Sequence, residues 1–116
     1  VAVLVLESHR TLTLRSMETI AAAAHARFAI TASLVIHREG RIAPGEPIVF
    51  VATAAAHRRA AFEAADYLMD RLKSEAVFWK REEGQGGARW IEPTDADAQD
   101  LARWAEDASR IEDARN

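Results

Sequence analysis

Hydrophobic and polar positions along this chain follow periods that are typical of alternating strands and helices. Val1–Leu6 is a continuous apolar run, which predicts a strand buried on both faces. Apolar side chains then recur three and four positions apart from Met17 to Phe28, which predicts a helix with Thr13 as its N-cap. Residues 30–36 alternate between apolar and polar types, so a half-buried strand follows.

The second half of the chain continues in the same way. Pro44-Gly45 is a turn signal, with glycine suited to a positive φ, and the strand after it forms a hairpin with residues 30–36. A helix, two antiparallel strands joined by a Gly-rich turn, and a last helix come next. The predicted ranges are Pro47–Thr53, His57–Glu75, Val77–Glu83, Ala88–Glu92 and Thr94 to about Ile111. The helix His57–Glu75 is expected to bury Phe62, Ala65, Leu68, Met69 and Leu72, with Asp66 and Asp70 outside.

Composition narrows the class of protein. A chain of 116 residues with 49% hydrophobic residues predicts one packed domain over residues 1–116. There is no cysteine, which excludes disulfides, thiolate metal sites and a cysteine nucleophile, and fits a cytoplasmic protein. The net charge is −3, and residues 91–116 hold eight acids against three arginines, so residues 94–116 read as an acidic helix and tail. The sequence has no dense stripe of basic residues, which nucleic-acid binding would need, and no apolar run long enough to span a membrane.

The choice of basic residues singles out two positions. Lys73 and Lys80 are the only lysines, and the other 13 basic residues are arginines. Lysine carries a compact ammonium that can lose its proton when desolvated, which arginine cannot do. Lys80 follows Phe78-Trp79, and such bulky neighbours can make an amine a nucleophile or proton donor. The alternative is that both are ordinary solvated lysines, with Lys80 on an edge strand.

His57-Arg58 stands where a predicted helix begins directly after a strand. Unpaired backbone N–H groups and the positive end of the helix dipole favour anions there, and phosphate in particular. A solvated N-terminal turn is the other interpretation. Because a helix rises 1.5 Å per residue, His57 and Lys73 lie roughly 24 Å apart along it. One small molecule can therefore touch both only if two subunits share the site.

Several motifs together resemble the large, catalytic subunit of molybdopterin synthase. The central stretch is AAAHRRAAFEAADYLMDRLKSEAVFWKRE, followed by ARWIE, which is similar to the family's A-H-R, A-F-E-A, L-K, F-W-K-x-E and W-[VI]-E segments. Upstream, LVIHREG and PGEPIVF are similar to its V-x-x-x-H-R-x-G and x-G-[DE]-x-x-V segments. The similarity extends from about Val1 to Trp104, and the L-K and W-K pair seven residues apart is its most specific part.

This resemblance implies a fold, a reaction and partners. The fold is α+β, an α/β hammerhead-type arrangement with a mostly antiparallel sheet and three helices. The implied assembly is a homodimer that binds two small ubiquitin-like sulfur-carrier subunits as a heterotetramer. The carrier inserts a thiocarboxylated Gly-Gly C-terminus, and sulfur passes twice to cyclic pyranopterin monophosphate to form the dithiolene of molybdopterin. No metal or other cofactor is implied for the step.

Matching the motifs residue by residue implies the site. Lys73 and Lys80 fall on the family's two active-site lysines, His57 and Arg58 on its substrate-binding pair, and Arg89 on an arginine of the pocket region. The family also carries an N-terminal F-x-G-x-V-R segment that is expected to precede this sequence. Without that segment the alternative function is a catalytically impaired, dimeric binding protein for the sulfur carrier. A plain α+β domain with accidental lysines is the third interpretation.

Overall fold

The computed structural model describes residues 3–76, 78–84, 87–91 and 99–104, with the backbone alone for 88–91. Its labelled elements are β1 (Val3–Ser8), α1 (Arg10–Arg27), β2 (Ala32–His37), β3 (Gly40–Ile42), β4 (Val49–Ala54), α2 (Arg58–Glu75), β5 (Phe78–Gly84) and β6 (Gly87–Ile91). Residues 99–104 are also helical. Helices and antiparallel strands thus combine as the α+β class predicts, although most of the predicted terminal helix lies outside the described residues.

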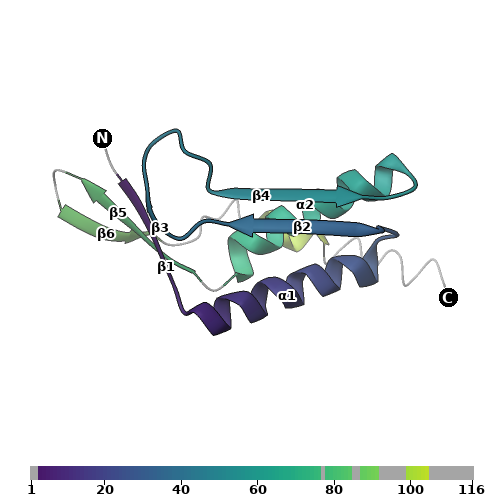
Figure 1. Ribbon diagram of the computed structural model, residues 1–116, viewed down its shortest axis with the longest axis horizontal. Helices are drawn as coiled ribbons and strands as arrows, with labels where there is room; N and C mark the ends of the chain where they lie inside the picture. The colour runs from purple at the N-terminus through teal and green to yellow at the C-terminus, as the bar shows by residue number, and fades with distance from the viewer. Residues whose placement is uncertain (1–2, 77, 85–86, 92–98, 105–116) are drawn as a thin grey trace.

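The strands form two antiparallel sheets. One has the order β3-β1-β5-β6, and the other is the hairpin of β2 and β4. Figure 1 shows the four-stranded sheet at one end of the molecule, and the long hairpin running beside α1 and α2. β1 lies between β3 and β5, and its Val5 and Leu6, which point to opposite faces of the sheet, are both buried. The sequence did not predict β3, which lies within the connection of the hairpin.

The turn in that connection forms as predicted. Gly45 adopts a φ of +84°, and the Glu46 N–H donates a 3.1 Å hydrogen bond to the Ala43 carbonyl. This geometry needs a glycine at the third turn position. The Glu46 carboxylate also accepts from the Ala43 N–H, so the turn that leads into β4 is fixed at both ends.

The helices pack on each other and on the hairpin. The central buried cluster consists of Ile20, Ala24, Tyr67, Leu68, Leu72 and Trp104, and Val35, Val49 and Val51 from the inner face of the hairpin pack against it. The predicted stripe of α1 is confirmed at Ile20 and Ala24. The predicted N-cap at Thr13 is wrong, because the helix begins earlier, with His9 Nδ1 accepting from the Leu12 N–H, and Thr13 is buried.

Two further expectations about burial are wrong. Phe62 is 75% exposed, because the buried face of α2 follows Ala64, Leu68 and Leu72, and a residue two positions from Ala64 points the opposite way. Asp70 is buried instead of exposed, because it accepts hydrogen bonds from residues 103 and 104. On the hairpin, the valines turn inward, and the larger side chains Leu34, Ile36 and Phe50 are left exposed.

No helix within the described ranges combines the length and the apolar character that crossing a membrane requires.

Candidate functional site

A cavity of about 230 Å³ lies where the two sheets and α2 meet. Most of its lining is aliphatic or aromatic, and its polar side chains are His37, Lys73, Ser74 and Lys80. The apolar lining residues are Leu4, Leu6, Ile48, Val49, Met69, Leu72, Ala76 and Phe78. A concave apolar site with a few convergent polar groups is typical of a ligand pocket.

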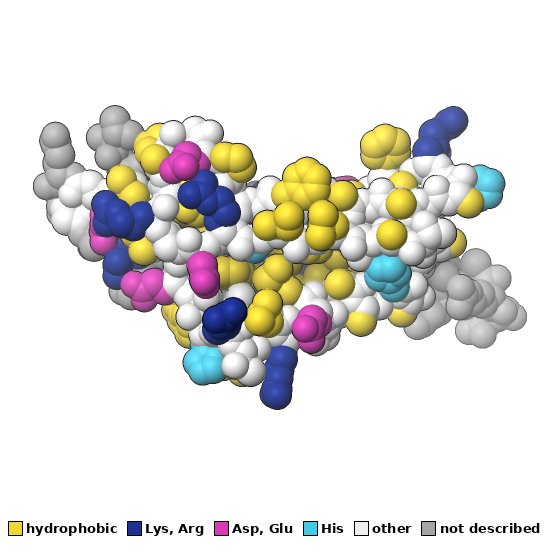
Figure 2. All heavy atoms as spheres, in the orientation of Figure 1, with side chains coloured by type: hydrophobic (Ala, Val, Ile, Leu, Met, Phe, Trp, Pro, Cys, Tyr) yellow, Lys and Arg dark blue, Asp and Glu magenta, His cyan; other side chains and the backbone are white. Residues whose placement is uncertain are grey.

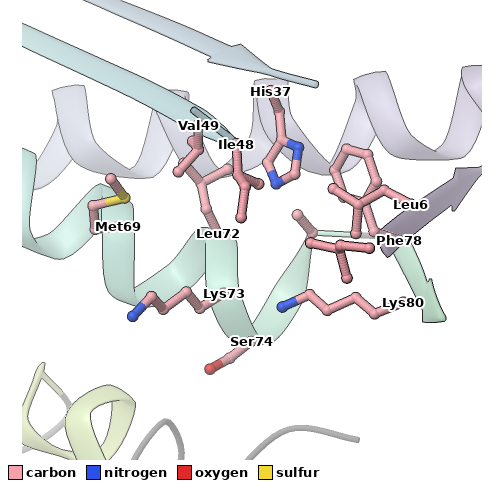
Figure 3. Close-up of a pocket in the computed structure, with 12 residues that line it drawn as sticks. Leu6, His37, Ile48, Val49, Met69, Leu72, Lys73, Ser74, Phe78 and Lys80 are labelled. Carbon is pink, nitrogen blue, oxygen red and sulfur yellow. The ribbon is translucent and has the colours of Figure 1, made fainter. Parts of the chain in front are cut away.

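Both lysines of the chain line this cavity (Figure 3). Lys73 lies in the last turn of α2 and is exposed, whereas Lys80 lies on β5 and is half-buried. The Lys80 side chain extends from β5 toward the end of α2, and the Lys73 side chain runs along that helix end, away from β5. The seven-residue spacing therefore brings both side chains to one pocket, because the chain turns back from helix to strand between them.

The neighbours of Lys80 explain its position. β5 is an interior strand, with Leu6 of β1 opposite Lys80 on one side and Ile91 of β6 on the other. The interpretation of Lys80 as an edge-strand cation is therefore wrong. No carboxylate in the described part of the chain forms an ion pair with either lysine, so both ammonium groups are available to an anionic ligand.

His57 and Arg58 lie at the opposite end of α2. His57 is the N-cap residue, makes no side-chain capping bond, and like Arg58 is exposed. The first turn of the helix contains no acidic residue, so its positive end is not neutralised from within the helix. Neither residue lines the cavity with the lysines, as the length of the helix requires.

The fifth predicted residue, Arg89, is placed only by its backbone. It pairs with Glu82 of β5, and Ile91, two residues further along β6, pairs with Lys80. The side chain of Arg89 lies outside the described residues. The register puts this position on the strand next to Lys80.

Sequence reasoning assigned no role to two polar residues of the cavity, Ser74 and His37. His37 ends β2 and lines the pocket between the hairpin and Phe78 (Figure 3). Its ring stacks on the Phe78 ring, with centroids 4.0 Å apart and planes 21° apart. His37 lies in the LVIHREG motif, but the sequence does not predict its place in the cavity, because the stacking partner is 41 positions away.

Burial of the ring lowers the pKa of His37 below its ordinary value. The positive charge of Lys80 lowers this pKa further, and the hydrogen bond to the backbone of Arg38 acts in the opposite direction. His37 is therefore neutral at pH 7. Within the described residues, no group of three or more His, Cys, Asp or Glu side chains forms a metal-binding cluster.

Comparisons with known proteins show which family the chain is similar to. The model of the MoaE protein family matches residues 1–75. The molybdopterin synthase catalytic subunit of Caulobacter vibrioides is 57% identical over 103 residues, which are 89% of this chain and 69% of that protein. The subunit of the same name from Cereibacter sphaeroides is 50% identical over 99 residues, 85% of this chain and 68% of that protein.

Solved structures agree with this. The molybdopterin biosynthesis MoaE protein of Burkholderia ambifaria superimposes with a TM-score of 0.78 at 42% identity, over 90% of this chain and 71% of that one. Molybdopterin synthase from Staphylococcus aureus, at 23% identity, shares the fold with a TM-score of 0.74 over 78% of this chain and 66% of that one. The extent of the family match and the identity to these relatives show that the chain belongs to the MoaE protein family.

Proposed function

We propose that the cavity between the two sheets and α2 is the sulfur-transfer pocket of this chain, with Lys73 and Lys80 as its catalytic cations. As a member of the MoaE family, the chain has the role of the molybdopterin synthase catalytic subunit, a sulfur-transferring enzyme of molybdenum cofactor biosynthesis. The observation that carries the proposed site is that the only two lysines of the chain line one cavity.

The sulfur donor in this proposal is the thiocarboxylated Gly-Gly tail of a small ubiquitin-like carrier. A tail without side chains suits a concave cavity with a mostly aliphatic lining. An ammonium group can pair with the thiocarboxylate and then stabilise the negative charge that develops during transfer. Neither lysine is neutralised by a carboxylate of the described chain, so both can act on the incoming anion.

The sulfur acceptor is cyclic pyranopterin monophosphate, whose phosphate needs a cationic site. The start of α2 offers backbone N–H groups, the His57 and Arg58 side chains and no acidic residue in the first turn. This combination suits a phosphate. Arg89, on the strand beside Lys80, is the further cation that we assign to the substrate.

If the lysines and the His57-Arg58 pair act on one pterin, the length of α2 means that they come from different subunits. At 1.5 Å per residue, the Lys73 end and the His57 end of the helix are roughly 24 Å apart, which exceeds the size of a pterin. We therefore propose a homodimer in which one subunit supplies the lysines and its partner supplies the phosphate site. Two carriers then complete a heterotetramer.

The hairpin offers the surface for such a dimer. Leu34, Ile36 and Phe50 are each more than half exposed on its outer face, and Figure 2 shows hydrophobic side chains gathered there over β2 and β4. Large exposed apolar patches are typical of interfaces. β4 runs from Val49, which lines the cavity, to Ala54, three residues before His57. A two-fold axis across the middle of the hairpin therefore places the His57 end of each subunit over the pocket end of the other.

A reconstituted assay tests the proposed function. The purified chain is mixed with a thiocarboxylated carrier and cyclic pyranopterin monophosphate, and the dithiolene product is measured as a stable fluorescent derivative. We expect two sulfur atoms transferred per pterin. Binding of carrier and pterin without product would favour the alternative function, a dimeric carrier-binding protein.

A further inference from the structure

His37 is a described polar residue of the cavity to which the proposed function gives no role. It enters the pocket from the hairpin, whereas Lys73 and Lys80 enter from α2 and β5. It also lines a neighbouring cavity together with Phe78, so the stacked pair of rings forms a wall common to both cavities. The ring is thus held in a fixed orientation at the point where the two sheets meet.

The hydrogen bonding of His37 fixes which ring nitrogen carries the proton. Nδ1 lies 2.8 Å from the carbonyl oxygen of Arg38. A carbonyl can only accept, so Nδ1 is the donor and in the neutral ring Nε2 carries the free lone pair. Within the described residues Nε2 has no hydrogen-bond partner, and Figure 3 shows this outer nitrogen turned toward the side of the pocket where Lys80 lies.

Burial and the positive charge of Lys80 both lower the pKa of His37 and so favour the neutral ring. Lys80 of β5 and Lys73 of α2 face it from the first cavity, and Arg10 of α1 and Glu39 line the second cavity beside it. The Glu39 carboxylate accepts from the Ser8 hydroxyl. An anionic ligand beside the lysines adds negative charge and makes Nε2 a stronger base.

The chemistry of sulfur transfer creates a need for a proton acceptor. When a thiocarboxylate sulfur displaces an oxygen substituent from a carbon of the acceptor, the product is a thioester that still joins carrier to pterin, and the displaced oxygen leaves with the electron pair of the broken carbon–oxygen bond. Release of the carrier requires that water attack the acyl carbon, and water must lose a proton as it attacks. The other titratable groups of the cavity lining are the two lysines, which are cations, so His37 is the one lining group that accepts a proton readily at pH 7.

We propose that His37 is the general base of this pocket and that its Nε2 takes the proton of the water molecule that cleaves the carrier–pterin thioester. The water oxygen bonds to the acyl carbon, the acyl carbon–sulfur bond breaks, and its electron pair stays on sulfur as a thiolate, which the lysine ammonium groups stabilise. The carrier tail leaves as a carboxylic acid that ionises to solvent. No oxidant or reductant is needed. This inference rests on the proposed function.

His37→Gln tests the inference in the reconstituted enzyme with thiocarboxylated carrier and cyclic pyranopterin monophosphate. Glutamine keeps a polar side chain of similar reach but accepts no proton at neutral pH. We expect kcat to fall by about 10²–10⁴-fold with KM within a few-fold, which is the usual contribution of a general base. Mass spectrometry of the carrier should then show the thioester adduct with pterin accumulating, and added imidazole should restore part of the rate in His37→Ala.

His25→Gln is the matched control. His25 is an exposed histidine of α1 that contacts Ser33 and lines none of the described cavities, so its replacement should leave kcat unchanged. A His37→Gln variant with wild-type kcat, or one that loses rate without accumulating the adduct, overturns the inference. Failure of the proposed function gives a different result, because the wild-type chain would then transfer no sulfur.

Nitrogen NMR of the wild-type chain covers the case in which a His37 variant does not fold. The expected result at pH 7 is a neutral His37 ring with hydrogen on Nδ1. A ring protonated on Nε2 at that pH has no lone pair to accept a proton and overturns the inference without any mutation.

Discussion

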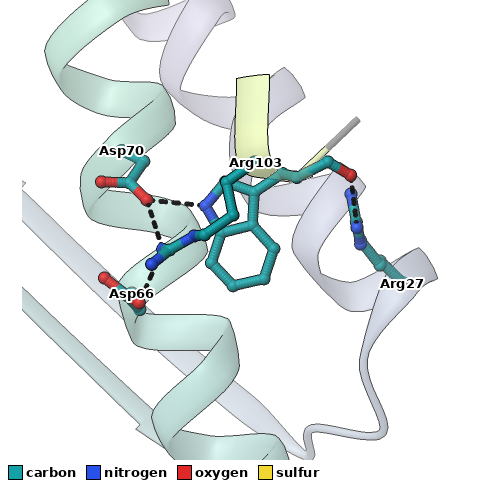
Figure 4. A network of polar contacts seen from close by, with 5 residues as sticks. Arg27, Asp66, Asp70 and Arg103 are labelled. Atoms are coloured by element: carbon teal, nitrogen blue, oxygen red, sulfur yellow. Dashed lines mark hydrogen bonds and ion pairs between the residues drawn. The ribbon is translucent and has the colours of Figure 1, made fainter. Parts of the chain in front are cut away.

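Asp70 and Trp104 are joined by a buried hydrogen bond in which the indole Nε1–H donates to the Asp70 carboxylate at 2.6 Å. Arg103 donates to the same oxygen of Asp70 and also to Asp66, at 2.9 and 2.8 Å (Figure 4). On the other side, the Arg27 guanidinium donates to the Trp104 carbonyl. This network holds helical residues 99–104 against α1 and α2. The helix α2 has His57 at its start and Lys73 in its last turn.

Asp70→Ala should therefore destabilise the chain. The substitution leaves the buried indole N–H without an acceptor, which costs about 1–3 kcal/mol of unfolding free energy. Asp66→Ala is the control, because Asp66 is exposed and contacts Arg103 alone, and it should cost less than about 1 kcal/mol. Urea denaturation measures both. Equal losses in the two variants would contradict a special role for the bond to Trp104.

The fold could be predicted where apolar spacing decides the structure. The stripe of α1, the hairpin and the β5–β6 pair all follow from periodicity and turn residues. The orientation of the hairpin could not be predicted, since residues on both of its faces are apolar. Val35 and Val51 turn inward because the smaller side chains fit against the helices, and Ile36 and Phe50 are left outside.

Part of the site could be predicted from the sequence, and part could not. The two lysines were conspicuous because the chain uses arginine elsewhere, and the resemblance to the family assigned them a role. The roles of His37 and Asp70 could not be predicted, since each depends on a residue that is far away in sequence. The partner of His37 is Phe78, and that of Asp70 is Trp104. Only packing brings such pairs together.

Lys73→Ala and Lys80→Ala should each abolish sulfur transfer while the chain stays folded. Each removes one ammonium group that stabilises developing negative charge, and the loss of such a group costs about 10²–10³-fold in kcat. Neither lysine forms an ion pair within the described chain, so stability should change little. Single-turnover transfer from the carrier and thermal denaturation measure the two effects. Product formation at the wild-type rate by Lys73→Ala would refute the assignment.

Phe50→Asp should convert the proposed homodimer into monomers. Phe50 is 54% exposed on the outer face of the hairpin, where a buried, unpaired carboxylate would weaken association by at least about 100-fold. Phe62→Asp is the matched control, because Phe62 is 75% exposed on α2 and lies outside that face. Sedimentation equilibrium reports the oligomeric state. A monomeric Phe62→Asp together with a dimeric Phe50→Asp would place the interface on the helix instead.

The stability of the chain should depend on pH through His37. Burial lowers its pKa in the folded chain, so between that pKa and 6.5 the unfolded chain binds more protons. Stability from this source is complete above pH 6.5 and is lost as the pH falls through the folded pKa. His37→Gln should flatten this part of the pH dependence of the unfolding free energy. Identical slopes for wild type and His37→Gln would show that the ring titrates alike in both states.

Complementation between two inactive variants tests whether the site is shared by two subunits. Lys73→Ala and Arg58→Ala should each be inactive as homodimers. In a mixed dimer, the pocket of the Arg58→Ala subunit keeps its own Lys73 and receives an intact Arg58 from the partner subunit. Random mixing makes half of the dimers mixed, each with one intact site, so about a quarter of the wild-type activity should return.

The same experiment has a clear negative outcome. If one chain supplied both residues to a single site, each subunit of the mixed dimer would carry a defect and no activity would return. Mixing Lys73→Ala with Lys80→Ala is the matched control, because the proposed geometry places both lysines in the pocket of one subunit. That mixture should stay inactive, since neither pocket is then complete. Activity in the control and none in the test mixture would assign the lysines, and not the arginine, to opposite subunits.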